Sequence, residues 1–294
     1  MHSLVLLKHF AREALSWRTP RRTPEPVLLM DDPAQVDGYV RAGCEDGPMA
    51  ATYLLHTLQL CQMIRAGDEV VDLACGPANL LCQVARLNPQ AHFVGIDLAG
   101  NMLERAQDHA QRQRLTNIRF MHGDITRLTQ VAGRSADLVM STLSLHHLPD
   151  AGRLEACFGE IARIVKPGGA VYLADLGRLK HEATLQFVAS QDAERHPPLY
   201  TVDFLNSMRA AFPVQTLRQA SRRLAFLPGL ELLHTFLVPF MVVIKTPARH
   251  TLPPSAAAAC RQLWQAMSPG QRMDFEGLRR IFAWGGLRSP HPDA

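Results

Sequence analysis

The sequence has no apolar run long enough to cross a membrane. Its longest strongly apolar run, Phe236 to Ile244, is interrupted by Pro239 and is far shorter than the roughly 20 residues that a bilayer requires. The N-terminus has only a brief apolar patch, Leu4 to Leu7, which Lys8 follows at once, so a signal-peptide pattern is also missing. We therefore expect a cytoplasmic protein without a membrane span.

Cysteine pairs and a strong net charge are missing as well. Reduced thiols are expected, not a disulfide framework or a zinc site, because no CxxC pair occurs among Cys44, Cys61, Cys75, Cys82, Cys157 and Cys260. A formal charge of +4, spread over 294 residues, does not predict a nucleic-acid surface. The stretch from Met1 to Pro26 carries five Lys or Arg against two Glu, and we interpret it as a solvated basic arm.

Short β-rich runs alternate with helical stretches between about Asp68 and Leu176. The predicted strands are Glu69–Leu73, His92–Ile96, Ile118–Met121, Ala136–Ser141 and Ala170–Ala174. The predicted helices between them are Ala78–Leu87, Asn101–Arg112 and Ala151–Val165. Such alternation indicates an α/β fold, with a parallel sheet and helices on both faces.

The flanking segments leave this alternation. Before it, helices are predicted at Asp32–Tyr39 and Met49–Ile64. After it come predicted helices at Lys180–Ser190, Thr201–Phe212 and Val214–Arg223, and later at Ser255–Met267 and Pro269–Ala283. Two strands between these groups, Glu231–Thr235 and Phe240–Lys245, must be antiparallel because the link between them is short.

A turn of small residues follows the first predicted strand. Ala74, Gly76 and Ala78 keep this turn open to a ligand, and the next helix offers free backbone N–H groups. Many α/β proteins have such a turn, but Asp72 at the strand end is more specific. Its carboxylate would repel a pyrophosphate and suits a ligand with a positive ammonium group. This argues against the nicotinamide-binding turn, whose pattern is G-x-G-x-x-G.

Acidic residues recur at the ends of the next two predicted strands. Asp97, 25 residues after Asp72, can accept hydrogen bonds from both hydroxyls of a ribose. Asp124, which follows Gly123, can accept from an exocyclic amine while Ile125 packs on a purine face. Each acid also fits an ordinary role as a turn former or helix cap. Their succession along the ligand-binding edge of the sheet favours a shared ligand site.

These motifs, together with Ala136-Asp-Leu-Val and Lys166-Pro-Gly-Gly, resemble the class I S-adenosylmethionine-dependent methyltransferases, and most of all the small-molecule branch that includes the ubiquinone/menaquinone C-methylases. The resemblance covers about 68–176, and 231–245 by topology. It implies a doubly wound, seven-stranded, Rossmann-like sheet with N-terminal and inserted helices forming a lid. The implied organisation is an N-terminal arm with lid helices over 1–67, a methyltransferase domain over 68–250 with its substrate cover at 180–223, and a C-terminal helical extension over 251–294.

The resemblance also implies an S-adenosylmethionine site. The turn would wrap the methionine part, Asp72 would lie near its ammonium group, Asp97 would hold the ribose, and Ser141 would contact the cofactor through its backbone. The full implied set is Tyr39, Asp72, Ala74, Cys75, Gly76, Asp97, Leu98, Met102, Gly123, Asp124, Ile125 and Ser141. The family usually has glycine where this chain has Ala74 and Ala78, and alanine is an accepted replacement. Tyr39 and Tyr53 are candidate lid contacts, or equally well ordinary half-buried aromatics.

The end of the fourth predicted strand narrows the range of possible methyl acceptors. It ends in Ser141-Thr-Leu-Ser, without the Asn/Asp-Pro-Pro-aromatic motif of nucleic-acid and amide N-methylases. Ser141 cannot replace the aspartate of metal-assisted catechol O-methylases, because hard divalent cations favour carboxylate oxygens. We expect metal-free transfer to O, N or C of a small molecule, such as a secondary metabolite, or to a peptide side chain, and no nucleic-acid partner.

Two adjacent histidines follow this strand. His146 is the candidate general base because histidine titrates near neutral pH, and His147 is expected to point away and be structural. The alternative is that both shape the loop and cap the next helix.

Two other interpretations of the function of the chain remain open. One is a nicotinamide-dependent oxidoreductase, although G-x-G-x-x-G and Tyr-x-x-x-Lys are absent; the other is a non-catalytic S-adenosylmethionine-binding partner protein.

Overall fold

The computed structural model describes residues 2–17, 19–25, 47–190 and 198–293. The predicted helix Asp32–Tyr39, with the candidate cofactor residue Tyr39, lies outside the described residues, as does Cys44. The other five cysteines are free thiols. None of the helices in the described ranges combines the length and apolar character that a membrane span needs.

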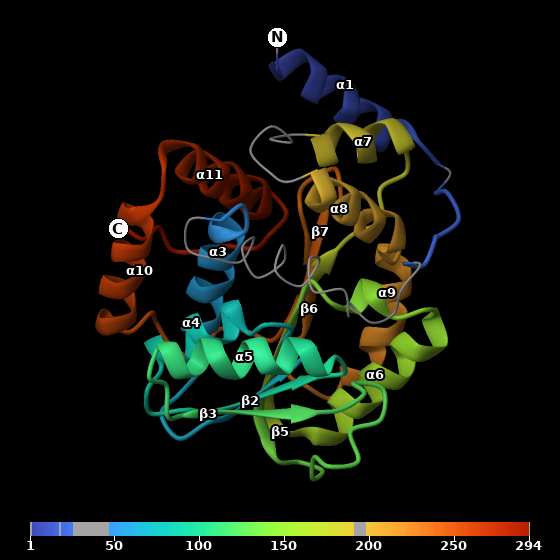
Figure 1. Ribbon diagram of the computed structural model, residues 1–294. Coiled ribbons are helices and arrows are strands. Elements are labelled where there is room, and N and C mark those ends of the chain that lie inside the picture. Colours follow the sequence, from blue (N-terminus) through green and yellow to red (C-terminus); the bar gives the residue numbers. More distant parts are fainter. Residues whose placement is uncertain (1, 18, 26–46, 191–197, 294) are drawn as a thin grey trace.

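A seven-stranded sheet forms the centre of the molecule (Figure 1). Its strands are β1 (Glu69–Leu73), β2 (His92–Asp97), β3 (Ile118–His122), β4 (Ala136–Thr142), β5 (Val165–Leu176), β6 (Glu231–His234) and β7 (Met241–Lys245). Their order across the sheet is β3-β2-β1-β4-β5-β7-β6. The first five pair in parallel, and β7 runs antiparallel between β5 and β6. The predicted doubly wound seven-stranded fold is confirmed.

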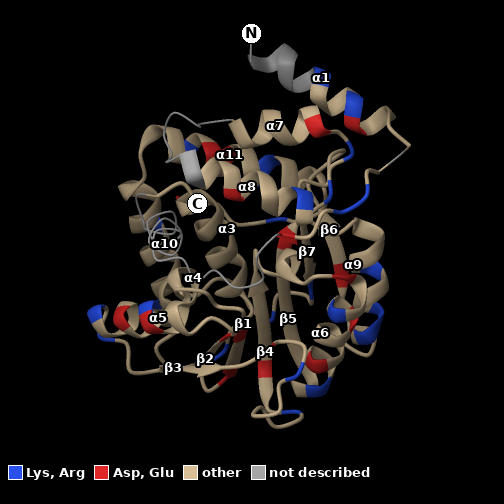
Figure 2. Ribbon diagram, turned by 45° about the vertical axis from the view of Figure 1, so that its right-hand side comes forward, with Lys and Arg blue, Asp and Glu red and all other residues tan. Residues whose placement is uncertain are grey.

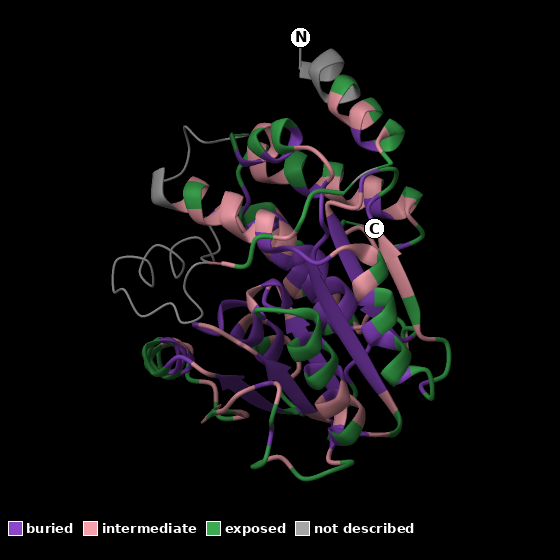
Figure 3. Ribbon diagram, turned by 90° about the vertical axis from the view of Figure 1, so that its right-hand side faces the viewer, coloured by how far each residue is buried: buried purple, intermediate pink, exposed green. Residues whose placement is uncertain are grey.

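Helices cover both faces of the sheet, and each face has its own hydrophobic core. Successive strand residues alternate between the two cores, so Val70 and Phe93 face one while Val71 and Val94 face the other. Figure 3 shows the buried strands between partly exposed helices, and Figure 2 shows charged residues mainly on helices and loops. The first core is shared with α3 (Ala50–Leu60), α4 (Asn79–Leu87), α5 (Gly100–Arg112), α10 (Pro254–Ala266) and α11 (Pro269–Trp284). The second is shared with α6 (Ala151–Ile164) and α9 (Val214–Ser221).

Local sequence explains where two of these helices begin. The Asp150 carboxylate accepts a hydrogen bond from the backbone N–H of Arg153 and so caps α6. Ser268 and Gln271 form a reciprocal capping box at α11, whose first residue is Pro269. Each cap satisfies backbone donors that the helix itself leaves unpaired.

The segments expected to form a lid divide between two places. The helices α7 (Glu182–Ser190) and α8 (Pro198–Ala210) lie near the end of the sheet where β5 finishes, and α8 contacts the short 3-10 helix η1 (Leu145–His147) after β4 (Figure 1). In contrast, α9 packs on α6, because its apolar face is buried in the second core. Likewise α3 is a core helix, and its Tyr53 is buried in the first core. Among the described residues, α7 and α8 lie where a cover was expected.

The N-terminal segment is not the solvated basic arm that its charge pattern suggested. Its helix α1 (His2–Leu15) is anchored to the start of α7 through Glu13, which is only 1% exposed. The Glu13 carboxylate accepts hydrogen bonds from the backbone N–H groups of Lys180, at 2.7 Å, and His181, at 2.9 Å. The basic composition of the segment did not predict this contact, because the contact is made by a single buried acidic residue, Glu13.

Residues 19–25, which follow α1, continue along α8 toward η1. From here on, the term arm refers to these residues alone. Arg22 anchors the arm, and its guanidinium donates to the backbone oxygens of Ala210, Leu148, Pro149 and, at 2.7 Å, His146. The same group lies 4.0 Å from the ring centroid of Phe212. Carbonyl groups therefore satisfy a charge that we had expected to face solvent.

The C-terminal helices complete the first core. Both α10 and α11 pack on α3, and the rings of Phe275 and Phe282 are fully buried there. Residues 50–64, the sheet and residues 260–287 contribute to this same cluster. The first core therefore contains residues from both sides of the divisions expected near residues 67 and 250.

Candidate active site

The turn between β1 and α4 has a strained backbone. Three of its residues have positive φ: Ala74 at 55°, Gly76 at 54° and Ala78 at 59°. Left-handed backbone costs an L-residue about 1–2 kcal/mol, so the fold holds strain at both alanines that glycine would avoid. This conformation presents the backbone N–H of Gly76 to Asp97, whose Oδ2 accepts it at 2.7 Å. Such strain is often found at ligand sites.

Asp97 lies at the tip of β2, where it was predicted. Its Oδ1 accepts from the backbone N–H of Ala99 at 2.9 Å, and the residue is 9% exposed. Burial raises the pKa of Asp97, although the hydrogen bonds from Ala99 and Gly76 oppose this. The turn lies close to β2 because Gly95 has no side chain: a Cβ there would come within 2.8 Å of the Cys75 Sγ. The sequence therefore brings the turn and the second carboxylate together.

Asp72 lies beside them with a carboxylate oxygen that lacks a partner. It is 3% exposed, and its Oδ1 has no hydrogen bond to any described residue. Burial, and then the charge of Asp97, raise the pKa of Asp72 well above its usual value. A buried oxygen without a donor is destabilising. An ammonium group would supply both the missing donor and the opposite charge, so this position fits the methionine part of S-adenosylmethionine.

Asp72→Asn is expected to remove a pH-dependent loss of stability. The folded pKa of Asp72 lies above the unfolded value of 3.8, so the folded state holds this proton more tightly. The contribution of Asp72 to stability then falls as pH rises from about that value through the folded pKa. An amide does not ionise, so urea unfolding should favour the variant over the wild type more at pH 8 than at pH 5.

The same variant should lose cofactor affinity, by about 1.5–3 kcal/mol, because the ammonium group loses a charged partner. The exposed Asp108 on α5 provides the control variant Asp108→Asn, which should change neither property. A difference between Asp72→Asn and wild type that is the same at both pH values would contradict the assignment.

At the end of β3, Asp124 serves as a turn former. Its Oδ1 accepts from the backbone N–H of Thr126 at 2.8 Å and from the Thr126 hydroxyl at 2.7 Å. Its Oδ2 lies 3.6 Å from the Arg153 guanidinium. Gly123 donates its N–H to the Asp97 carbonyl, which places the ends of β2 and β3 side by side. The alternative role weighed from sequence is therefore present, and Ile125 beside it is buried.

Ser141 is the penultimate residue of β4 and is fully buried. Its hydroxyl donates to the Leu73 carbonyl at 2.8 Å and lies 2.6 Å from the Ser144 hydroxyl. The side chain thus joins β1 to the loop before η1, which leaves only the backbone of Ser141 for a ligand. Of the other predicted cofactor residues, Leu98 is half-buried and Met102, on α5, is buried.

The histidine pair is arranged differently from the sequence-based expectation. His146 is 3% exposed, its Nδ1 lies 2.6 Å from the Asp175 carboxylate, and its Nε2 lies 3.9 Å from Glu25. The side chain of His147 is 30% exposed, and its Nδ1 lies 2.7 Å from Glu25. His147 was expected to point away, but the rings of His146 and His147 both face Glu25. The buried position of His146 between two carboxylates argues against its predicted role as the base.

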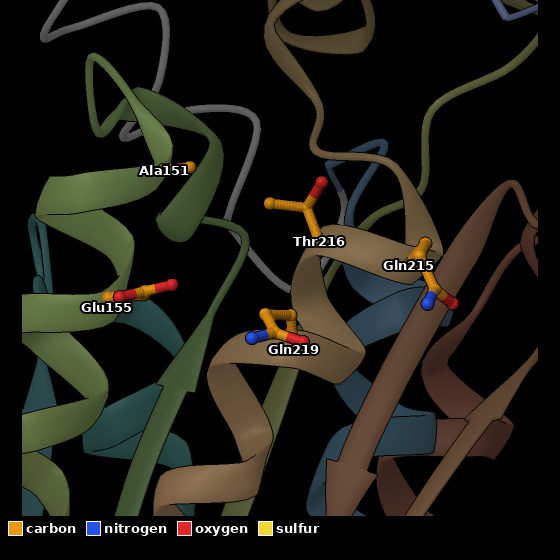
Figure 4. A pocket seen from close by; sticks show the side chains of 5 residues that line it. All are labelled: Ala151, Glu155, Gln215, Thr216 and Gln219. Atoms are coloured by element: carbon orange, nitrogen blue, oxygen red, sulfur yellow. The ribbon is translucent and has the colours of Figure 1, made fainter.

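Sequence reasoning missed both carboxylates of this cluster. Asp175 lies near the end of β5, so its position after an apolar strand could have drawn attention to it. Glu25 gave no signal, because it lies in the arm, 122 residues from His147. A hollow between α6 and α9 was not predicted either; it is lined by Ala151, Glu155, Gln215, Thr216 and Gln219 (Figure 4). None of the strand-end residues lines it.

The parallel strands, the turn and the row of carboxylates define a class I methyltransferase fold. A family model described as a methyltransferase domain matches residues 64–224, which is more than half of the chain. The chain therefore belongs to this methyltransferase family.

Two relatives named ubiquinone biosynthesis O-methyltransferase illustrate the similarity in sequence. The one from Albidiferax ferrireducens is 30% identical over 175 residues, which cover 59% of this chain and 65% of that protein. The one from Acinetobacter baylyi is 28% identical over 167 residues, which cover 56% and 68%. The match thus spans about two thirds of the length of each relative.

Two solved structures share the fold. A putative S-adenosylmethionine-dependent methyltransferase from Methanococcus maripaludis has a TM-score of 0.53 at 16% identity, with 79% of this chain and 98% of that chain covered. A methyltransferase from Aquifex aeolicus has a TM-score of 0.50 at 13% identity, with 73% and 97% covered. At these identities the likeness concerns the fold alone.

Proposed function

We propose that the protein transfers the methyl group of S-adenosylmethionine to a small molecule without the help of a metal ion. The observation that carries the use of S-adenosylmethionine is the buried, unpartnered Asp72 oxygen next to the Gly76–Asp97 hydrogen bond. The name of the two O-methyltransferase relatives favours oxygen, among O, N and C, as the acceptor atom. The free cysteines support a cytoplasmic location.

The strand-end residues would divide the cofactor among them. The turn from Ala74 to Ala78 would surround the methionine part, with Asp72 at the ammonium group. A carboxylate accepts up to about four hydrogen bonds. Asp97 already accepts from the backbone N–H groups of Gly76, Ala99 and Leu98, so accepting capacity would be left for the ribose. Asp124 and Ile125 would meet the adenine. The remaining members of the proposed site are Tyr39, Cys75, Leu98, Met102, Gly123 and Ser141.

The protein's own contribution to the reaction is alignment. The sulfonium supplies a labile methyl group, so the enzyme must hold the acceptor in line with it and exclude water. The helix α7 packs on α8, and the arm packs along α8, so together they would exclude water from the strand ends. A general base is needed only where the acceptor has to lose a proton.

Calorimetry with a chelator present tests the proposal. S-adenosylmethionine and its demethylated product are expected to bind with the same affinity whether the chelator is present or not. The protein should then be screened against small molecules that carry hydroxyl groups, with mass spectrometry to detect the gain of one methyl group. Absence of cofactor binding at millimolar concentration would contradict the proposed function, and a loss of binding caused by the chelator would contradict the metal-free reaction.

A further inference from the structure

We infer that His147 is the general base of this enzyme and that Glu25, supplied by the arm, orients it. The inference rests on the proposed function, with a hydroxyl as the acceptor. It replaces His146 by its neighbour, and it gives the N-terminal segment a part in the active site.

The ring of His147 has one nitrogen held and one available. Its Nδ1 lies 2.7 Å from the Glu25 Oε2, whereas no hydrogen bond joins its Nε2 to any described residue. A carboxylate at Nδ1 holds the proton on that nitrogen and leaves Nε2 as an acceptor. With its side chain 30% exposed, His147 can be reached by an acceptor molecule. The charge of His147 also acts on the Asp97 carboxylate at the tip of β2.

Glu25 is built into the cluster as a charged group. The Ser207 hydroxyl of α8 donates to its Oε1 at 2.6 Å. Burial alone would raise the pKa of Glu25, but the hydrogen bond and charge of His147, the charge of His146 and the Ser207 hydrogen bond lower it to about 2. Asp203 on α8 is the other acidic group whose charge interacts with Glu25. Glu25 therefore stays ionised at neutral pH, as a partner for an imidazolium must.

His146 has the features of a positioning residue. Burial lowers its pKa, but the charge and hydrogen bond of Asp175, with the charge of Glu25, outweigh this and raise it. The ring of His146, at 3% exposed, is too buried to meet an acceptor. Asp175 also accepts the backbone N–H of His146 at 2.7 Å. This fixes η1 and, with it, the position of the next residue, His147.

The proposed step moves one proton. The acceptor oxygen bonds to the methyl carbon while the carbon–sulfur bond breaks, and the electron pair of that bond goes to sulfur. The proton of the acceptor hydroxyl passes to the Nε2 of His147, and Glu25 stabilises the imidazolium that results. Water removes the proton before the next turnover.

His147→Ala is expected to lower kcat by about 10²–10⁴-fold with the hydroxyl acceptor found in the screen, and to remove the acid limb of the pH–rate profile. Glu25→Gln keeps the size of the side chain, and should lower kcat by about tenfold or more with S-adenosylmethionine affinity unchanged. His92→Ala, at the exposed start of β2, is the matched control and should behave as wild type. Full turnover with an intact pH limb in His147→Ala would overturn the inference.

A second measurement needs no acceptor. Diethyl pyrocarbonate modifies accessible neutral imidazoles, so peptide mass spectrometry of the wild-type protein should find His147 modified well before His146. The reverse order would also overturn the inference. Failure of the proposed function is distinguishable from both outcomes, because it would appear as absent S-adenosylmethionine binding by the wild-type protein.

Discussion

Asp97→Ala is expected to weaken S-adenosylmethionine binding by about 2–4 kcal/mol, a factor of roughly 30 to 700. In the proposed site, the variant would lose two hydrogen bonds between a charged group and the ribose. It also removes the acceptor for the N–H groups of Gly76 and Ala99, which hold the turn beside β2. Calorimetric titration of the variant and the wild type measures the difference directly.

A control separates this effect from a general loss of charge. Asp108→Ala removes an exposed carboxylate from α5 and should leave the affinity within about twofold of wild type. Far-ultraviolet circular dichroism should confirm that both variants are folded. Equal affinities of Asp97→Ala and wild type would mean that the carboxylate at the tip of β2 does not hold the ribose.

Phe282→Ala is expected to lower the free energy of unfolding by about 3–5 kcal/mol. The ring is fully buried in the core that joins α11 to α3 and the sheet, so its removal leaves a cavity there. Urea unfolding followed by circular dichroism should show one transition, shifted to lower urea. The shift should affect the whole molecule, because this core crosses the division expected near residue 250.

Met273→Ala is the matched control on the same helix. Met273 is 71% exposed, so its substitution should change the free energy of unfolding by at most about 0.5 kcal/mol. Two separate transitions in Phe282→Ala, with the main one unchanged, would instead mean that residues 251–294 fold as an independent unit.

Much of the fold could be predicted because it is encoded locally. The strands β1 to β5 were found from alternation between β-rich and helical runs, and the late antiparallel pair from the short link that joins it. The helices were harder to place, because an amphipathic pattern predicts which face of a helix is buried but does not identify the element that this face packs against. For this reason α9 and α3 were expected in a lid, whereas both pack against the body of the fold.

The strand-end carboxylates were also accessible to sequence reasoning. Asp72 lies near the end of a predicted strand and Asp97 and Asp124 follow theirs, and parallel strands bring their carboxyl ends to one edge. The role of each carboxylate was less accessible. Asp72 has an unpartnered oxygen and Asp124 is engaged with Thr126, a contrast that depends on which donors the fold places nearby.

The sequence by itself determined the family, the sheet and the row of carboxylates, because strand periodicity, turn residues and strand ends are local properties. Only the tertiary structure decided which of two adjacent histidines is buried and which is exposed. That choice depends on Asp175 from β5 and on Glu25 from the arm, 122 residues before His147. Such partners meet only when Arg22 packs the arm against α8 and the loop after β4. Long-range contacts of this kind leave no periodic pattern in the chain.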